Sequence, residues 1–275
     1  MNANLNGKVA VITGAGGTIC SEVAIDLAKN GVKLALVGRT AEKLEKTAAA
    51  IKEVGGECFI FACDVCDSEK IEELADKVYE VYGKCDFLIN GAGGNQNAAM
   101  PSIIQFDERE IDGTLPEGTR GFYDIDMDCF ESVIKINTMG SVLPIRAFAK
   151  RMAKDGGGSI INFASGAGLF GNYGQCSYAA AKEGIRGLSR VAATEWGPDG
   201  INVNVVCPIA WTAQLENFQK AYPEAFKANV KMPPMGHYGD PELEIGRVCV
   251  QLAHPDFKYL SGETLTLEGG MGLRP

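Results

Sequence analysis

The chain has 275 residues, 46% hydrophobic and 22% charged, so it carries enough apolar material for a large core and is not a disordered chain. Its 26 Lys and Arg residues against 35 Asp and Glu residues give a net charge of −9, which argues against nucleic acid or an anionic membrane surface as its main partner. No apolar run approaches the roughly 20 residues that cross a bilayer. Residues 1–8 lack the apolar core of a signal peptide, so we expect a cytoplasmic protein.

The nine cysteines are an odd number, which fits reduced thiols in a cytosol. Cys63 and Cys66 form a C-x-x-C pair, for which a redox function and plain buried thiols are the two interpretations, and we favour the second. A zinc site needs further ligands at matching spacing, and neither His237 nor His254 has one nearby in the sequence. We therefore expect no metal ion.

Short apolar runs alternate with segments of helical periodicity in the first third of the chain. Strands are expected over Val9–Ile12, Leu34–Val37, Cys58–Ala62 and Phe87–Ile89. The helices between them are expected over Thr18–Asn30, Leu44–Ile51 and Ile71–Val78.

The alternation resumes with a long helix over Met127–Ala153, which Pro144 should kink. The elements expected after it are a strand over Ser159–Phe163, a helix over Ser177–Trp196, strands over Ile201–Val206 and Thr264–Leu267, and a helix that starts at Asp240-Pro241. Apolar strands separated by helices predict an α/β fold, a doubly wound parallel sheet of about seven strands with helices on both faces. We find no internal repeat and no linker, which favours one domain over residues 1–275.

Two segments interrupt this pattern, at about 94–122 and 211–238. Each follows the carboxyl end of a strand, where open α/β sheets bind ligands. Long irregular connections are often lids or binding loops, and the alternative is an exposed insertion or an oligomer contact. We favour a lid for the second segment and leave the first open.

The run from Thr13 to Cys20, T-G-A-G-G-T-I-C, lies between an expected strand and an expected helix. Glycines allow a pyrophosphate to approach the backbone, and a helix N-terminus supplies N–H donors. An ordinary glycine-rich turn is the alternative.

Tyr178 and Lys182 are four residues apart, so they share one face of a helix. An ammonium group one turn away stabilises a phenolate and lowers the pKa of the tyrosine, which suits acid–base catalysis, although the same spacing also occurs in surface pairs. Ser165 follows the strand that ends at Phe163 and could lie at the same edge of the sheet.

These motifs occur in a characteristic order, namely Thr13-Gly14 with its glycines, Asn90-Gly-Ala-Gly93, Asn137, Ser165 and Tyr178-x-x-x-Lys182. In this combination the chain resembles the short-chain dehydrogenase/reductase family over nearly its whole length. Within the family, the segments 90–95, 122–126, 234–241 and 268–270 resemble the D-mannonate oxidoreductase (fructuronate reductase) branch. The resemblance implies a single-domain Rossmann fold, a nicotinamide cofactor, a small-molecule substrate and a homotetramer.

The resemblance also implies roles. Tyr178 would be the acid or base at the substrate oxygen, Lys182 would lower its pKa and bind the nicotinamide ribose, and Ser165 would hydrogen-bond the reacting carbonyl. Asn137 would hold a water of a proton relay, with a helix-packing hydrogen bond as the alternative. Asp64 would bind the adenine edge, and Asn90 would steady the sheet. The implied cofactor residues are Gly14, Gly16, Gly17, Thr18, Ile19, Arg39, Asp64, Val65, Asn90, Gly91, Ala92, Tyr178, Lys182 and Pro208.

The chain departs from the family pattern at Thr18 and Cys20, which stand where the last two glycines of the run usually are. Thr18 could bind a phosphate or cap the helix. Cys20 places a side chain where close helix–strand packing usually has none, which puts the pose of the pyrophosphate in doubt. Ile209 follows Pro208 where the family usually has glycine.

The second strand ends without the carboxylate that would bind a ribose 2′-hydroxyl. Arg39 lies there instead and could pair with a 2′-phosphate, or it could be a solvated surface charge. We expect NADP(H) rather than NAD(H).

Polar residues in the two irregular segments favour a polyhydroxylated acid, and we expect a ketone–alcohol interconversion, D-fructuronate to D-mannonate. The candidate polar residues are Asn95, Gln96, Asn97, Arg120, Gln214, Lys231 and His237. An apolar lid over a steroid is the alternative, with Trp211, Phe218, Tyr222 and Phe226 as its candidates. A gluconate-type keto acid is a further alternative. Outside enzymes, the alternative is a catalytically inactive nucleotide-binding regulator, for which Thr18 and Cys20 are the only argument.

Overall fold

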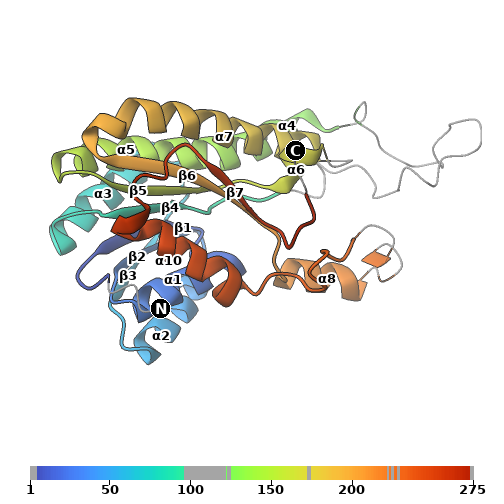
Figure 1. Ribbon diagram of the computed structural model, residues 1–275, viewed down its shortest axis with the longest axis horizontal. Helices are drawn as coiled ribbons and strands as arrows, with labels where there is room; N and C mark the ends of the chain where they lie inside the picture. Colours follow the sequence, from blue (N-terminus) through green and yellow to red (C-terminus); the bar gives the residue numbers. More distant parts are fainter. Residues whose placement is uncertain are drawn as a thin grey trace, which may run out of the picture.

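The computed structural model describes residues 5–95, 122, 125–171, 175–221, 223, 226–227 and 230–272. Seven strands form one sheet in the order β3-β2-β1-β4-β5-β6-β7 (Figure 1). Every neighbouring pair is parallel, so the expected doubly wound sheet is confirmed. The strands are β1 (Val9–Thr13), β2 (Lys33–Gly38), β3 (Cys58–Ala62), β4 (Phe87–Asn90), β5 (Gly158–Phe163), β6 (Ile201–Pro208) and β7 (Thr264–Leu267).

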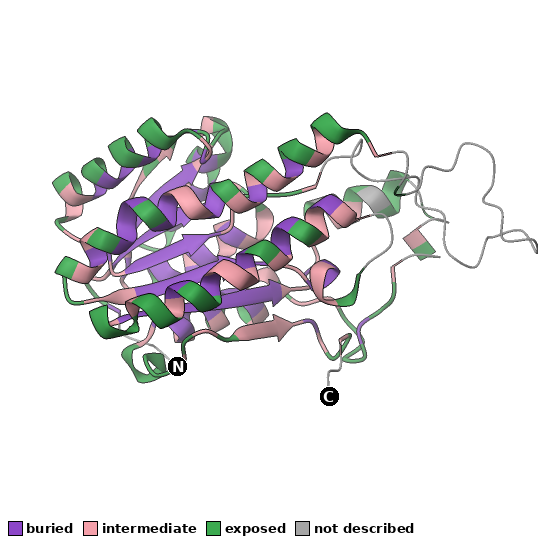
Figure 2. Cartoon of the chain, turned by 90° about the horizontal axis from the view of Figure 1, so that it is seen from above, coloured by how far each residue is buried: buried purple, intermediate pink, exposed green. Residues whose placement is uncertain are grey.

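Helices cover both faces of the sheet, and the central strands between them are buried (Figure 2). One face carries α1 (Thr18–Lys29), α2 (Ala41–Glu53) and α10 (Arg247–Ala253). The other face carries α3 (Ser68–Tyr82), α5 (Gly140–Lys154) and α7 (Cys176–Trp196). Three shorter helices are α4 (Met127–Ile134), α6 (Gly166–Phe170) and α8 (Ala213–Ala221).

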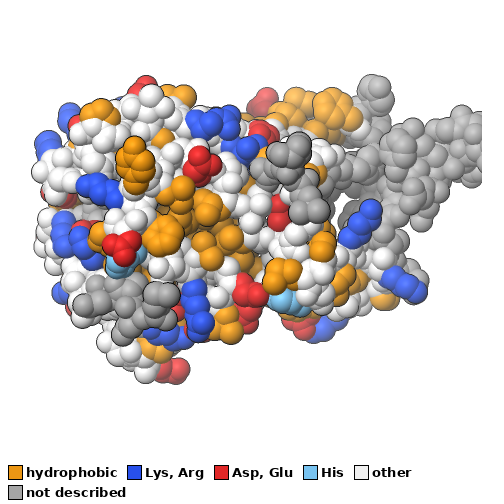
Figure 3. Space-filling model, viewed as in Figure 1, with side chains coloured by type: hydrophobic (Ala, Val, Ile, Leu, Met, Phe, Trp, Pro, Cys, Tyr) orange, Lys and Arg blue, Asp and Glu red, His pale blue; other side chains and the backbone are white. Residues whose placement is uncertain are grey.

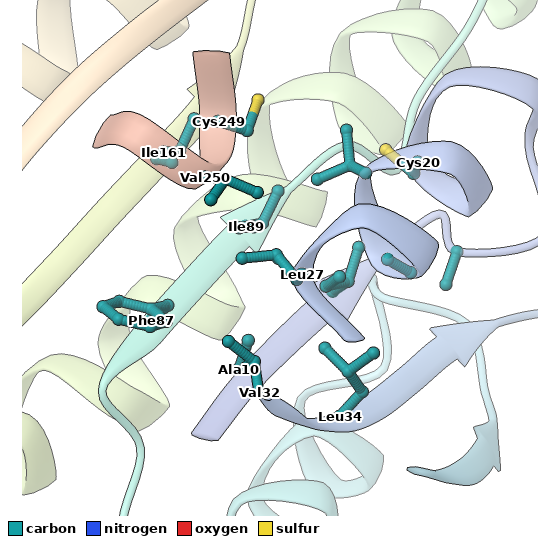
Figure 4. Close-up of a cluster of buried hydrophobic side chains, with 14 of the residues drawn as sticks. Ala10, Cys20, Leu27, Val32, Leu34, Phe87, Ile89, Ile161, Cys249 and Val250 are labelled. Carbon is teal, nitrogen blue, oxygen red and sulfur yellow. The ribbon is translucent and has the colours of Figure 1, made fainter. Parts of the chain in front are cut away.

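The central strands β1, β2 and β4 carry apolar runs because alternate side chains enter two different cores. In β1, Ala10 and Ile12 pack into the first core, while Val9 and Val11 pack into the second. Figure 4 shows the first core, where Leu27 of α1 lies among side chains of the strands and of α10. Burial on both faces therefore explains why these runs show no polar–apolar alternation.

Capping residues set several helix ends. The Asp67 side chain accepts hydrogen bonds from the backbone N–H groups of Glu69 and Lys70, and Gly83 ends α3 at a φ of 75°. Asp240 caps the helical segment that starts at Pro241, as the sequence predicted.

The long helix expected over Met127–Ala153 is instead three segments, because a π-helical stretch, η4 (Lys135–Met139), separates α4 from α5. A second π-helical stretch, η6 (Pro241–Gly246), leads into α10. The irregularity precedes Pro144, and α5 continues through that proline to Lys154. A stretch of five residues is too short for its change of period to show in the apolar pattern, so the sequence does not reveal it.

No helix in the described ranges is long and apolar enough to cross a membrane. The first irregular segment lies almost wholly outside the described residues. Within the second, α8 accounts for the helical pattern, and Ala210 forms a parallel bridge with Gly239.

Candidate active site

The strand order reverses between β1 and β4, and a cleft opens at their carboxyl ends. Thr13 at the end of β1 accepts hydrogen bonds at its Oγ1 from the N–H groups of Gly91 and Ala92, both at 3.2 Å. These bonds hold the turns after β1 and β4 together. The cleft has a volume of about 590 Å³, in the range of ligand sites.

The glycine-rich turn approaches its neighbours too closely for side chains. Gly14 has a φ of 73°, and a β-carbon there would lie 2.8 Å from the N atom of Ala92. A β-carbon on Gly16 would lie 2.7 Å from Cβ of Lys43. The glycines therefore leave the backbone of this turn open towards the cleft.

Helix α1 begins with uncapped N–H groups, because its N-cap residue is Gly17 and no side chain accepts from the first turn. Thr18 is the first helical residue and does not cap the helix, so that alternative is wrong. A helix N-terminus that faces a glycine-lined cleft suits a pyrophosphate. The residues present fit the nucleotide cofactor that the fold implies.

Cys20 is accommodated by a glycine of the facing turn. A β-carbon on Gly91 would collide with the Cys20 Sγ, so the missing side chain at Gly91 creates the space for the thiol. Burial raises the pKa of Cys20 to about 12 and keeps the thiol neutral. Cys20 therefore replaces the usual glycine here because Gly91 leaves room for its thiol.

Of the residues expected to bind the cofactor, eight line the cleft. They are Gly14, Gly16, Gly17, Arg39, Asp64, Val65, Gly91 and Ala92. Those that do not line it are Thr18, Ile19, Asn90, Tyr178, Lys182 and Pro208. Sequence reasoning missed Lys43 and Lys135, whose periodicity on α2 and η4 marks them only as exposed helix positions.

Ser165, Tyr178 and Lys182 come together at the carboxyl edge of the sheet. Ser165 is the N-cap of α6, and it hydrogen-bonds Tyr178 of α7. The Lys182 Nζ lies 5.5 Å from the centre of the Tyr178 ring. Burial raises the pKa of Tyr178, while the hydrogen bond with Ser165 opposes that shift.

Lys182 is 4% exposed, and its Nζ donates to the Phe163 carbonyl at 2.9 Å. Burial lowers its pKa to about 8. A β-carbon on Gly93, which lines the cleft, would lie 3.3 Å from this Nζ. Lys182 therefore lies between the tyrosine and the wall of the cleft.

The buried Asn137 lies within η4. Its Nδ2 donates to the carbonyl groups of Gly94 and Val133, both at 2.8 Å, and its Oδ1 accepts from the Gly94 N–H. The side chain thus joins the helix to the turn after β4, which matches the packing alternative. The relay role stays a prediction.

Asn90 begins a chain of buried hydrogen bonds. Its Nδ2 donates to Oδ1 of Asn162 on β5, and the Asn162 Nδ2 donates to Oγ of Ser189 on α7. This chain ties the strand that carries the Gly91 turn to the helix that carries Tyr178.

The second irregular segment is organised by aromatic contacts. The Trp211 ring lies 6.2 Å from that of Phe226 and 5.6 Å from that of Tyr238. The Tyr238 hydroxyl donates to the Lys231 carbonyl, while His237 pairs with Glu244 at 2.9 Å. Of the other candidates, Gln96, Asn97, Arg120 and Tyr222 and the side chains of Gln214 and Phe218 lie outside the described residues.

The C-x-x-C pair lies just before α3, but its thiols do not have the lowered pKa of a redox site. Burial raises the pKa of both thiols, to about 11 for Cys63. Among the described residues, no cluster of His, Cys, Asp or Glu could hold a metal ion.

A parallel sheet with this order, a glycine-lined cleft at its switch point and a Ser–Tyr–Lys group beside it define a dinucleotide-dependent oxidoreductase. Residues 8–222 match the family described as short chain dehydrogenase. The chain belongs to this family, and it is an oxidoreductase that acts on CH–OH groups with NAD(H) or NADP(H).

Three relatives illustrate the range of the family. A 12alpha-hydroxysteroid dehydrogenase from a Clostridium species is 48% identical, over 98% of each chain. The structure of a putative D-mannonate oxidoreductase from Haemophilus influenza with bound NAD is 30% identical, with a TM-score of 0.85 over 97% of this chain and 95% of that one. A 7 alpha-hydroxysteroid dehydrogenase complexed with NADH and 7-oxo glycochenodeoxycholic acid is 29% identical, with a TM-score of 0.83 over 98% and 96% of the chains.

Proposed function

We propose that the chain is a hydroxysteroid dehydrogenase that interconverts a steroid ketone and its secondary alcohol with NADP(H). The observation that carries the proposal is the 48% identity, over nearly the full length, to a protein named for a hydroxysteroid substrate. This choice replaces our preference for D-fructuronate with the steroid alternative.

Exposed apolar side chains on α6, the end of the second irregular segment and the C-terminal tail support the proposal. Phe170, Met232, Met235 and Met271 are 45%, 60%, 67% and 36% exposed. We call these four residues the apolar rim. The rim residues come from α6, the end of the second irregular segment and the C-terminal tail, which meet where Met235 N–H donates to the Gly269 carbonyl. Exposed apolar surface of this kind suits a large apolar substrate.

The D-fructuronate/D-mannonate reaction is the second candidate. Asn95 lines the cleft, and a putative mannonate oxidoreductase structure shares 30% identity with this chain. The exposed apolar rim favours a steroid over a polyhydroxylated acid, so this reaction is the second candidate.

In the proposed mechanism the bound nicotinamide supplies or accepts the hydride. Ser165 Oγ hydrogen-bonds the substrate oxygen and orients the carbonyl. Tyr178 donates a proton to that oxygen during reduction and accepts it during oxidation. Lys182, as an ammonium group, favours the phenolate and so opposes the rise in the pKa of Tyr178 that burial causes.

The preference for NADP(H) is supported by two cations in the cleft. Arg39 and Lys43 both line it at the end of β2 and the start of α2, and neither forms an ion pair with any residue that the structure describes. A 2′-phosphate would supply the missing anion for both groups.

Arg39→Ala is expected to raise the KM for NADPH about 10- to 100-fold, the loss of one charged hydrogen bond, and to leave the KM for NADH nearly unchanged. Lys43→Ala should act in the same direction, while Lys46→Ala, an exposed position of α2 outside the cleft, is the matched control. Steady-state kinetics with both nucleotides give the answer, and equal effects on NADPH and NADH would contradict the assignment.

The function is tested with purified protein, NADPH and a panel of 3-, 7- and 12-oxo bile acids beside D-fructuronate. We expect at least one steroid ketone to be reduced with a kcat/KM about 100-fold above that for D-fructuronate. The reverse ranking would overturn the proposal in favour of the mannonate reaction. Binding of NADPH without turnover of any ketone would point to the inactive regulator.

We also propose that residues 1–275 act as one catalytic domain within a homotetramer. Two separate apolar surfaces support this assembly. One is a groove of about 610 Å³ between α5 and α7, lined by residues such as Ile145, Leu188 and Trp196. The other follows β7, a half-buried strand at the edge of the sheet, on the face where hydrophobic side chains gather in Figure 3. A homotetramer arranged as a dimer of dimers requires two surfaces that each pair with a copy of themselves. Sedimentation of a monomer at micromolar concentration would contradict the proposal.

A further inference from the structure

Glu268 is a buried acidic residue at the same edge of the sheet as the candidate active site. It follows β7 directly, and the Ile209 N–H donates to the carbonyl of the preceding Leu267 at 2.8 Å. Its side chain is 4% exposed. The proposed mechanism gives it no role.

The Glu268 carboxylate packs closely against Gly166 and Gly272. A β-carbon on Gly166 would lie 3.0 Å from the Glu268 Oε2, and a β-carbon on Gly272 would lie 2.8 Å from its Oε1. The Phe170 ring contacts the same two positions, at 3.0 Å from a β-carbon on Gly166. We call Gly166, Phe170, Glu268 and Gly272 the Glu268 cluster. It joins the C-terminal tail to α6.

This cluster bears directly on Ser165. Ser165 immediately precedes Gly166 and caps α6, with its Oγ accepting from the Ala167 N–H at 3.1 Å. Because α6 has only five residues, it has little packing of its own to fix its orientation. The Glu268 carboxylate and the Phe170 ring, which pack against Gly166, therefore help to set the orientation of the Ser165 hydroxyl.

The type of residue is informative as well. An apolar side chain could fill such a space at lower cost, because taking a carboxylate out of water is unfavourable. The two flanking glycines are what allow a side chain as long as glutamate to reach α6 from the tail.

We propose that Glu268 is a positioning residue for the reaction. It holds the first turn of α6 in place, and so fixes the position of the Ser165 side chain relative to Tyr178. The tail that it anchors also contacts the apolar rim, since a β-carbon on Gly269 would lie 3.5 Å from Cβ of Met235. The apolar rim and Ser165 are thus both linked to the segment that contains Glu268. This inference rests on the role proposed for Ser165.

The test compares Glu268→Ala, Glu268→Gln and the control Glu263→Ala, an exposed glutamate at the other end of β7. Kinetics are measured with the best ketone of the panel, and NADPH affinity is measured separately by fluorescence. We expect Glu268→Ala to lower kcat about 100-fold, the effect of a misplacement of roughly 1 Å at a reacting group. The Kd for NADPH should stay within about twofold, because Glu268 does not line the nucleotide cleft.

Rescue separates positioning from a general loss of structure. Glu268→Gln has nearly the same shape and should recover activity to within about fivefold of the wild type. Gly166→Ala disturbs the same contact from the α6 side. The loss of activity in the double variant should therefore be smaller than the product of the losses in Gly166→Ala and Glu268→Ala.

Full activity of Glu268→Ala would overturn the inference, as would a glutamine variant as poor as the alanine variant or an equal loss of NADPH affinity. Ser165→Ala is assayed in parallel. If Ser165→Ala retains activity, the proposed role of Ser165 fails. If only Ser165→Ala loses activity, the inference about Glu268 fails alone.

Discussion

Tyr178→Phe is expected to lower kcat for ketone reduction about 1,000-fold, because the substitution removes the only atom that can pass a proton to the substrate oxygen in the proposed mechanism. The ring and its packing against Lys182 are retained. NADPH affinity should therefore be nearly unchanged, and a single-turnover assay beside a binding titration measures the two effects separately.

Tyr259→Phe is the matched control, since its side chain is fully exposed and should not affect turnover. The pH dependence gives a second readout. Burial raises the pKa of Tyr178, so reduction, which needs the neutral phenol, should persist at neutral pH and fall at alkaline pH. Oxidation needs the phenolate and should increase with pH. A Tyr178→Phe enzyme that retains most of its activity would remove this residue from the mechanism.

Gly91→Ala is expected to destabilise the folded chain by about 2 kcal/mol and to weaken nucleotide binding, because the new methyl group collides with the Cys20 Sγ behind the cleft. A loss of this size lowers the melting temperature by about 4–8 °C in a protein of this size. Differential scanning calorimetry and a titration with NADPH measure the two effects.

The compensating variant is Cys20→Ala. With the sulfur removed, a β-carbon on Gly91 would meet Cβ of residue 20 at 3.7 Å, an ordinary contact, although the Thr13 carbonyl oxygen remains at 3.2 Å. The double variant should therefore recover part of the lost stability. Additive losses in the double variant would show that the thiol and the glycine are not coupled.

Most of the fold could be predicted from the sequence because most strands contain a short apolar run and the long helices have an apolar face. β3, for instance, was expected over Cys58–Ala62 and has those bounds. The π-helical turns at Lys135 and Pro241 could not be predicted, because each stretch is too short for its change of period to show in the apolar pattern.

The candidate site was predicted where a motif carries it, as for Gly14 and Tyr178. Lys43 and Glu268 were missed because what makes them relevant is distance in space. Lys43 lies in an exposed helix position, and only the folded chain brings it against Gly16. Glu268 formed part of a recognised pattern, but only the folded chain brings it against Gly166. Thr18 was thought able to cap α1, yet the chain enters the helix one residue earlier, at Gly17.

The uncapped start of α1 has a thermodynamic consequence. In the folded chain without nucleotide, no side chain accepts from the N–H groups of the first turn of α1. A nucleotide that binds these groups binds the native state and not the unfolded chain, so it stabilises the native state. At a concentration of 100 times its Kd, such a ligand adds about 2.7 kcal/mol to the free energy of unfolding. The heat resistance of this protein in a cell would then vary with the supply of its own coenzyme, and starvation for that coenzyme would hasten its turnover.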